Sequence, residues 1–316
     1  MKRMLRMPLL VVSAYAGCTD RADSGAAADV AHDVLTVDFS IGALDEARPE
    51  YEFGRISGLT LLADGRVAMA DALNHEVRIF EQDGTHALSV GRSGAGPGEL
   101  DSPCCIAVDD RQRLWVRDNG NARYSIFEVA RDSAAHVGQV RMAHGDANRY
   151  QPFGPHELTA HSPNGEFAHA LSSRYTIEWR AADGTVIRTL TRAIAEGPEL
   201  SATVRATGEE RMEQLATRLG VGRMQLGFDV PARKPVLRDL FFDRQGRLWV
   251  ERQVPNCGDR SADIYGVDGT LVRTVSWPAH VSLADGAIRD DVVWGVGRDS
   301  LDVPALVRLD GLGSYH

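Results

Sequence analysis

Apolar residues in this chain come in short runs that alternate with polar turns, and the same arrangement occurs twice between residues 58 and 128. Each copy has an apolar run, a polar turn, a second apolar run ending in aspartate (Asp71 or Asp118), a polar loop with asparagine, and a third apolar run. Short apolar runs bounded by turn-forming residues are typical of β-strands. Asp64-Gly65, in the first turn, supplies the positive φ that a two-residue hairpin needs. We therefore predict strand, tight turn, strand, loop and strand in each copy.

Three further copies follow along the chain. The third, over 158–190, has turn signals between its apolar runs but lacks the terminal aspartate. The fourth, over 240–275, repeats Ala107–Val116 almost residue for residue, and the fifth occupies 287–309. Four-stranded units that recur every roughly 40–50 residues are typical of a β-propeller, in which each small sheet buries its two faces against its neighbours. The fold class that we predict is therefore an all-β propeller.

Three tryptophans, Trp115, Trp249 and Trp294, stand at the same place in their copies. We interpret them as wedges between neighbouring blades, because large aromatic side chains contribute much of the area that a core buries. On this interpretation Trp115 and Trp249 are both buried, and neither has a binding role.

Five copies are clear, and we expect six blades. The sixth comes either from the degenerate stretch 193–235 or from an amino-terminal strand joined to carboxy-terminal ones. Residues 34–41 alternate between apolar and polar, as a strand does. Because an open blade would leave an unpaired strand edge, we predict that this strand completes the final blade and closes the ring. Residues 201–219 have helical apolar spacing, which predicts a short helical insertion near 200–220.

The amino terminus is predicted to be a targeting segment. Residues 1–17 hold three basic residues, no acid, and an apolar run over 8–16 that is too short to span a bilayer. The sequence Tyr15-Ala16-Gly17-Cys18 resembles the bacterial lipobox, with Tyr15 where an aliphatic residue is usual. The resemblance implies that Cys18 carries a lipid. An ordinary secretory signal cleaved nearby is the alternative.

We accordingly divide the chain into a lipoprotein signal peptide (1–17), a flexible tether (18–33) and the propeller domain (34–316). The tether is assigned because its residues are small and polar. The expected location is the bacterial cell envelope, with the lipid anchor as the contact with the membrane. We expect a monomer.

The charge of the chain excludes some classes of partner. The formal net charge is −9, and without residues 1–17 there remain 32 basic and 44 acidic residues. A surface this acidic repels nucleic acid and anionic lipid headgroups. We therefore expect no nucleic-acid partner, and a protein or small-molecule ligand instead.

Besides Cys18 the chain has three cysteines, Cys104, Cys105 and Cys257. Export makes disulfides possible, and an odd number leaves at least one thiol unpaired. Cys257 could bridge to either Cys104 or Cys105. No spacing of Cys and His indicates a zinc site.

The stretch from Asp64-Gly65 to Asp83-Gly84, with the glycine-rich Gly91–Pro103 after it, resembles the NHL-repeat-like six-bladed β-propellers of bacterial exported proteins and lipoproteins. Arg247–Val250 is similar to the later blades of that family, and the resemblance covers roughly residues 34–309. The resemblance implies a β-propeller fold and indicates almost nothing about activity.

Two catalytic motifs are considered and set aside. Gly91–Gly98 contains no lysine and opens no helix, so a tight turn between blades is favoured over a phosphate-binding loop. Ser93 lacks the G-x-S-x-G spacing of a hydrolase nucleophile. Asp71 and Asp118 are expected to cap turns by accepting backbone N–H bonds. The catalytic residues, if any, are therefore unknown.

In propeller-type lyases and lactonases, a metal on the central axis is held by Glu, Asn, Asp or His from several blades. We take five side chains near the blade ends as candidate ligand-binding residues: Asn119, Asn121, His144, His156 and Glu157. Asp239 is a further position that could point into the central channel. No spacing requires a metal, and we expect neither a metal nor a cofactor. The longest loops, Arg141–His156 and Arg252–Ala262, are the expected binding rim.

These observations favour an exported, lipid-anchored β-propeller that binds a ligand or a protein partner at one face of the disc. A propeller-type lyase or lactonase with an axial metal is the alternative. A purely structural component of the envelope is a third possibility, favoured if both faces of the disc are featureless.

Overall fold

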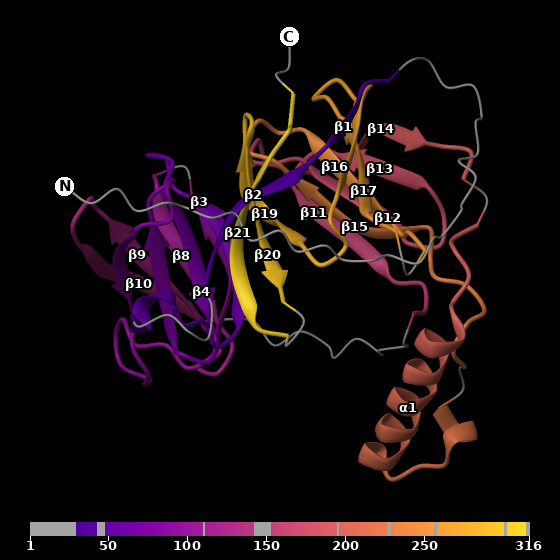
Figure 1. The fold of residues 1–316 in the computed structure, drawn as a ribbon, viewed down its shortest axis with the longest axis horizontal. Coiled ribbons are helices and arrows are strands. Elements are labelled where there is room, and N and C mark those ends of the chain that lie inside the picture. The colour runs from indigo at the N-terminus through magenta and orange to yellow at the C-terminus, as the bar shows by residue number, and fades with distance from the viewer. Residues whose placement is uncertain are drawn as a thin grey trace, which may run out of the picture.

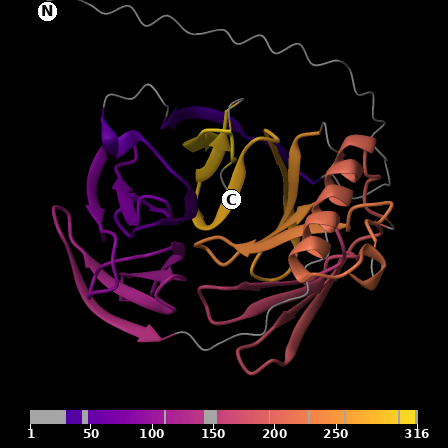
Figure 2. The same cartoon turned by 90° about the horizontal axis from the view of Figure 1, so that it is seen from below.

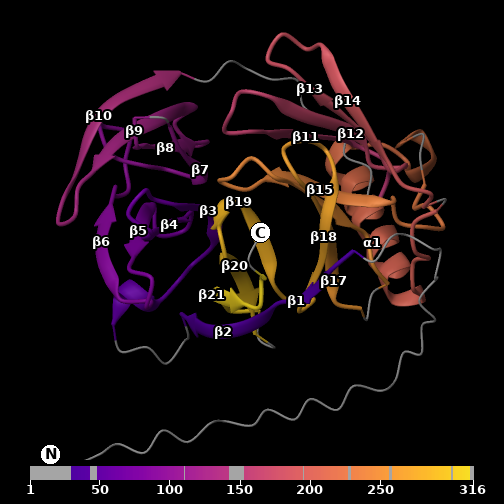
Figure 3. The same cartoon turned by 90° about the horizontal axis from the view of Figure 1, so that it is seen from above.

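In a computed structural model of the chain, the described residues are 30–42, 48–109, 111–141, 153–194, 196–226, 229–255, 258–299 and 302–313. They form five sheets arranged around one axis as the blades of a propeller (Figure 3). Within each blade the strands that follow one another in the chain pair antiparallel, in the order that the strand and turn pattern predicts. Gly65 has φ 88°, as the predicted turn after Asp64 requires.

The strands of each blade are given from the axis outward. Blade 1 contains β3 (Ile56–Leu61), β4 (Val67–Asp71), β5 (Glu76–Phe80) and β6 (His86–Val90). Blade 2 contains β7 (Pro103–Val108), β8 (Arg113–Asp118), β9 (Arg123–Val129) and β10 (Ala134–Arg141). Blade 3 contains β11 (Glu157–His161), β12 (Phe167–Leu171), β13 (Thr176–Arg180) and β14 (Val186–Thr191). A short 3-10 turn, η1 (Pro49–Tyr51), precedes blade 1.

The last two blades also take in the amino-terminal strands. Blade 4 contains β15 (Leu237–Phe242), β16 (Leu248–Arg252), β17 (Arg260–Tyr265), β18 (Leu271–Trp277) and, at its outer edge, β1 (His32–Val34). Blade 5 contains β19 (Ser282–Arg289), β20 (Val292–Arg298), β21 (Pro304–Asp310) and, at its outer edge, β2 (Thr36–Ile41).

The innermost strands β3, β7, β11, β15 and β19 begin at one face of the disc, which we call the front face, and end at the other, the back face. One cavity is lined by residues from the ends of β7, β11 and β15, which shows that these strands run in the same direction. In Figure 1 the carboxy terminus leaves at the top, beyond the back face, and the only long helix drawn lies at the bottom.

The amino-terminal segment closes the ring, as predicted. β2 pairs antiparallel with β21, the last strand of the chain, with Val37 opposite Leu309. β1 pairs parallel with β18, so one segment joins blades 4 and 5. Leu35, between the two strands, is 1% exposed and belongs to the core shared by these blades. The segment covers two sheet edges that would otherwise have unpaired backbone groups.

The number of blades differs from the expectation of six: the described residues form five. The degenerate stretch 193–235 gives no sheet, because it forms helix α1 (Ala202–Leu219) and a 3-10 turn, η2 (Arg223–Leu226). The amino-terminal strand adds to blade 5 instead of founding a sixth blade.

Helix α1 confirms the predicted helical insertion. Ser201 caps its start by accepting a hydrogen bond from the Val204 N–H, and Gly220, with φ 65°, ends it. The helix lies at the outer edge of the disc, on the side away from the carboxy terminus (Figures 1 and 2), and packs through a small cluster, in which Met212 and Val230 are buried. No helix among the described residues is long and apolar enough to cross a membrane.

Apolar cores fill four of the junctions between successive blades. Separate clusters of buried side chains join blade 1 to 2, blade 3 to 4, blade 4 to 5 and blade 5 to 1. Among the described residues no such cluster joins blades 2 and 3. Val140 and Leu171, on the facing sides of those blades, are 47% and 37% exposed. The junction between blades 2 and 3 is therefore the loosely packed one.

This junction explains why one predicted wedge is not buried. Trp249 and Trp294 are fully buried between blades, as predicted. The prediction for Trp115 is wrong: its side chain is only partly buried. It pairs across the strand with Ile126, on the face of blade 2 opposite to Leu114 and the blade 1 core. Trp115 therefore faces blade 3, where no apolar core receives it.

On the back face, arginine side chains join neighbouring blades by donating to backbone carbonyls. Arg66 of blade 1 reaches blade 2, where its Nη1 and Nη2 each lie 3.0 Å from a carbonyl oxygen, those of Arg131 and Ala130. Similar bonds link blade 3 to 4, blade 5 to 1 and blade 4 to 1, and their donors are Arg188, Arg289 and Arg244. These bonds help to hold the disc together at the back face.

Candidate functional site

Two of the predicted site residues, His144 and the lipidation residue Cys18, lie outside the described residues. The described ends of both expected rim loops lie at the front face. The first loop leaves β10 at Arg141 and enters β11 at Glu157, and the second joins β16 at Arg252 to β17 at Arg260. Cys257, in the second loop, is also outside the described residues, so its pairing with Cys104 or Cys105 stays a prediction.

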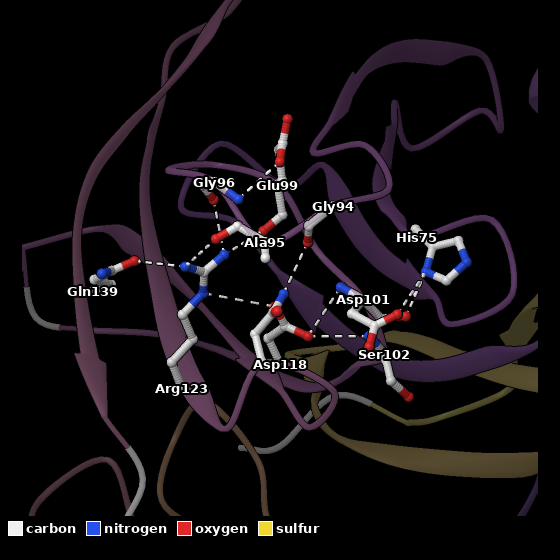
Figure 4. A network of polar contacts seen from close by, with 11 residues as sticks. His75, Gly94, Ala95, Gly96, Glu99, Asp101, Ser102, Asp118, Arg123 and Gln139 are labelled. Atoms are coloured by element: carbon white, nitrogen blue, oxygen red, sulfur yellow. Dashed lines mark hydrogen bonds and ion pairs between the residues drawn. The ribbon is translucent and has the colours of Figure 1, made fainter.

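In blade 2 a network of polar contacts holds the glycine-rich connector (Figure 4), and the predicted residue Asn121 takes part in it. Its Nδ2 donates to the Asp118 carboxylate at 2.7 Å and to the Gly94 carbonyl at 2.9 Å. The Arg123 guanidinium donates to three more carbonyls of the connector, those of Ala95, Gly96 and Glu99. The connector is therefore an interblade turn, as predicted, and Asn121 is engaged in holding it.

Asp71 caps its own turn, as predicted, and both repeated aspartates also accept backbone N–H bonds from residues before the first strand of their blade. Asp118 accepts hydrogen bonds from the backbone N–H groups of Asp101 and Ser102, which precede β7 (Figure 4). Asp71 likewise accepts from Gly54 and Arg55, before β3, and from Leu73 and Asn74 in its own turn. Each carboxylate thus ties the end of the second strand to the start of the first.

Blade 3 lacks the aspartate, and Ser172 takes its place. The Ser172 hydroxyl accepts a hydrogen bond from the His156 backbone N–H at 2.9 Å. The side chains of His156 and Glu157 are exposed at the front face, where β11 begins. Strand β11, which begins at Glu157, packs beside β15 of blade 4, the strand that carries Asp239.

Asn119, the remaining predicted residue, is exposed on blade 2, and its Nδ2 donates to the Cys104 sulfur at 3.2 Å. The four predicted binding residues that the structure describes are therefore not brought to one point. His156 and Glu157 lie beside blade 4, Asn119 lies beside the cysteines, and Asn121 lies in the interblade network. Among the described residues, no group of three His, Cys, Asp or Glu side chains is placed to hold a metal ion.

The structure shows a charged group that the sequence prediction includes only in part. We call Arg238, Asp239, Glu251 and Arg260 the blade 4 charge cluster. Arg260 binds Glu251 through two hydrogen bonds, Nε to Oε1 at 2.7 Å and Nη2 to Oε2 at 2.9 Å. The Nε of Arg238 approaches the same carboxylate at 3.2 Å. Arg238 and Asp239 stand on β15, at a bulge between Leu237 and Asp239.

Titration of the cluster is perturbed by its surroundings. Burial raises the pKa of Glu251, and the positive charges of Arg260 and Arg238 partly offset the rise. Burial also raises the pKa of Asp239, although its side chain remains accessible to solvent. Carboxylates with perturbed pKa values are candidates for a functional site, although buried ion pairs perturb pKa values as well.

A cavity of about 260 Å³ lies beside the cluster, at the front of the junction between blades 5 and 1; we call it the axial pocket. It is lined by the starts of β3 and β19 and the end of β20. Its polar side chains are Ser57, His280, Ser282 and Arg298, and no acidic side chain is among the residues that line it. The hydroxyl of Ser282 accepts a hydrogen bond from Arg260 Nη1 at 2.6 Å, which connects the pocket to the charge cluster.

Arg298 is the accessible cation of the pocket. Its Nη1 donates a hydrogen bond to the Asp302 carbonyl at 3.0 Å. The same atom lies 3.2 Å from the Asp302 carboxylate, and the Asp302 side chain is 83% exposed. Exposed ion pairs of this kind contribute little and are screened by water. Arg298 therefore keeps the capacity to bind an anion.

A second cavity, of about 140 Å³, lies on the axis at the back face and is lined by residues of all five blades. Arg244 lines it and crosses from blade 4 to donate to the Leu61 carbonyl of blade 1. This cavity is smaller, and one of its walls is a structural arginine, so the front face has the better site.

Sequence reasoning missed Arg238, Glu251, Arg260, His280, Ser282 and Arg298. One signal could have found Glu251. The second strand of blade 1 ends Ala70-Asp71 and that of blade 2 ends Arg117-Asp118, whereas in blade 4 the corresponding residues are Glu251 and Arg252. The sequence of the fourth copy thus differs from that of the first two at the positions that contribute to the charge cluster.

Comparisons with known proteins bear on the fold. No protein-family model matches the chain. The RING finger protein nhl-1 of Caenorhabditis elegans is 36% identical to it over 81 residues, which are 22% of this chain and 8% of that protein. The match thus spans under a tenth of the length of that relative and agrees with the repeat resemblance over that stretch alone.

Solved structures resemble the chain over most of its length. A member of the DUF4221 family from Bacteroides vulgatus ATCC 8482 has a TM-score of 0.50 and 9% identity, and covers 89% of this chain and 98% of its own. The glutaminyl cyclase of Myxococcus xanthus has a TM-score of 0.40 and 10% identity, and covers 90% of this chain and 100% of its own. At 9% identity, the likeness to the DUF4221 member bears on the fold and on no activity. With its five sheets around one axis, the chain is a β-propeller protein.

Proposed function

We propose that this propeller binds a small ligand carrying a carboxylate in the axial pocket of the front face. The observation that supports this is the composition of the pocket: His280, Arg298 and two serine hydroxyls, with no acid, in a chain of net charge −9. Apolar side chains such as Leu283 and Val296 supply the rest of the wall, which suits an aliphatic portion of the ligand. A cavity of about 260 Å³ suits a small molecule or fragment.

The charge cluster holds one polar group of the pocket, the Ser282 hydroxyl, in place. Arg260 is held by Glu251 and also donates from Nη1 to the Val281 carbonyl at 2.7 Å. Ser282 is thereby oriented by a guanidinium that is itself 7% exposed and cannot easily move. Preorganised polar groups of this kind bind with a smaller loss of conformational entropy.

Butyrate is a suitable probe, and butyramide is its uncharged counterpart. A fragment of this size should bind with a free energy of about −4 kcal/mol, which corresponds to a dissociation constant on the order of 1 mM. At about 10 mM, butyrate should then stabilise the fold by about 1.4 kcal/mol and raise Tm by a few degrees, measured by differential scanning calorimetry. Butyramide should have no measurable effect.

Arg298→Gln should abolish the shift caused by butyrate, because the charge that binds the carboxylate is lost. Arg131→Gln is the matched control, since Arg131 is an exposed arginine of blade 2, paired with Glu81 at 3.8 Å and outside the pocket. A shift that is equal for butyrate and butyramide, or that survives in Arg298→Gln, would contradict the proposed site.

We also propose that the protein is exported and held in the cell envelope by a lipid on Cys18, as a monomer with repeats of the NHL kind. The support is the leader in 1–17 and the Ala16-Gly17-Cys18 sequence after it. Cys18→Ser should shift the protein from the membrane fraction to the soluble fraction when cells are fractionated. Equal partition of parent and variant would show that the anchor is elsewhere.

A further inference from the structure

Two adjacent cysteines lie with their sulfurs in contact at the start of β7. The Sγ atoms of Cys104 and Cys105 are 2.7 Å apart, and both residues are free thiols. In a regular strand, neighbouring side chains point to opposite faces. Here Cys104 pairs with Arg117 and Ile106 pairs with Val116, so Cys105 is the extra residue of a β-bulge. The bulge, with Cys105 at φ 48°, places both sulfurs on one side.

The surroundings keep the pair in place and accessible. Cys105 is exposed, and Cys104 is partly so. Asn119 Nδ2 donates to the Cys104 sulfur at 3.2 Å. On the side of blade 1, a Cβ placed on Gly58 would lie 2.8 Å from the Cys105 backbone nitrogen, so β3 packs directly against the bulge. Burial and the neighbouring Cys104 thiol raise the pKa of Cys105 to about 11, so this sulfur carries a proton that Cys104 can accept in a hydrogen bond.

We propose that Cys104 and Cys105 form a reversible disulfide with each other, which makes this bulge a redox modification site on the front face. The oxidant is a small-molecule disulfide. One cysteine thiolate attacks it and releases the first small thiol, and the second cysteine then attacks the mixed disulfide and releases the second. One S–S bond forms between the cysteines, one is broken in the oxidant, and the two cysteine protons end on the two released thiols.

The geometry favours this pairing because the two sulfurs already lie in contact. The sulfurs already lie closer than two unbonded sulfurs would in ordinary packing, and the bulge has already set the backbone that brings them together. Accessible disulfides are among those that are reduced readily, so the bond should open again under mild reduction. The oxidising compartment that the proposed export provides would populate the disulfide form.

The test uses the full chain with Cys18→Ser and Cys257→Ser, so that only the pair remains. The protein is incubated with oxidised glutathione, alkylated with N-ethylmaleimide, digested with trypsin and analysed by mass spectrometry. The peptide that covers 93–111 contains both cysteines. After oxidation it should take up no N-ethylmaleimide and weigh two hydrogen masses less than the reduced peptide. After treatment with dithiothreitol it should take up two N-ethylmaleimide groups.

Cys104→Ser in the same background is the matched control. Its remaining thiol has no partner and should retain glutathione as a mixed disulfide, which shows that the oxidant reaches the site. Two glutathiones on the pair, or two thiols that stay open to alkylation after oxidation, would overturn the proposal. So would a digest of the chain with Cys257 intact in which the 93–111 peptide is linked to the peptide that contains Cys257. Equal Tm values for reduced parent and variants confirm that each is folded.

Discussion

Replacing Trp249 by alanine is expected to lower the free energy of unfolding by about 3–5 kcal/mol, as large-to-small changes in packed cores do. The side chain is fully buried between blades 4 and 5 and stacks on Phe241 with 5.6 Å between ring centroids. Its Nε1 also donates to Asp243 at 3.0 Å, so the change leaves a carboxylate oxygen with one donor fewer. Chemical denaturation followed by circular dichroism measures the loss.

Trp115→Ala is the matched control, because the two tryptophans occupy the same place in nearly identical sequences. Trp115 donates from Nε1 to Asp109 at 2.9 Å, as Trp249 does to Asp243, yet Trp115 is only partly buried. The expected loss is about 1–2 kcal/mol, in proportion to the smaller area removed from contact with water. Equal losses for the two variants would show that blades 2 and 3 pack as tightly as the others.

Removal of residues 1–41 is expected to destabilise the whole disc. The deletion removes β1 and β2, uncovers the edges of β18 and β21, and takes Leu35 out of the core of blades 4 and 5. The loss of Leu35 alone should cost about 2–5 kcal/mol, and the two open edges should promote aggregation. Calorimetry should show a lower Tm, and size-exclusion chromatography should show aggregated material.

A chain that starts at Val30 is the control, because it keeps both strands. It should match the parent in Tm and in elution volume. Leu35→Ala in the full chain separates loss of the apolar contact from loss of the strand pairing: it should lower stability without aggregation. A chain without 1–41 that melts like the control would show that ring closure does not depend on this segment.

Several features of the fold could be predicted because they depend on local chemistry. The turn at Asp64-Gly65 needs a positive φ, and glycine provides it. Asp71 accepts the backbone N–H groups of Leu73 and Asn74 in its own turn, as short polar side chains at strand ends commonly do. The closing strand could be predicted because an alternating segment without a sequence neighbour must pair at a free edge.

The candidate site could be predicted only in part, because it depends on which blade meets which. His156, Glu157 and Asp239 were identified as channel positions, and the structure places them at the front face of blades 3 and 4. The rest of the charge cluster could not be identified, since Arg238, Glu251 and Arg260 come from three different strands. The axial pocket depends on contact between blades 5 and 1, which are the last and the first in the chain.

The sequence by itself determined the all-β class, the four-stranded repeat, the helical insertion and the strand that closes the ring. These follow from hydrophobic periodicity and turn residues, which act over a few positions along the chain. Only the tertiary structure decided that five blades complete the disc, that Trp115 has no core to enter, and that the sulfurs of Cys104 and Cys105 meet on one side of a bulge. Each of these depends on the packing of one sheet against another or on strand register, and a repeat pattern specifies neither.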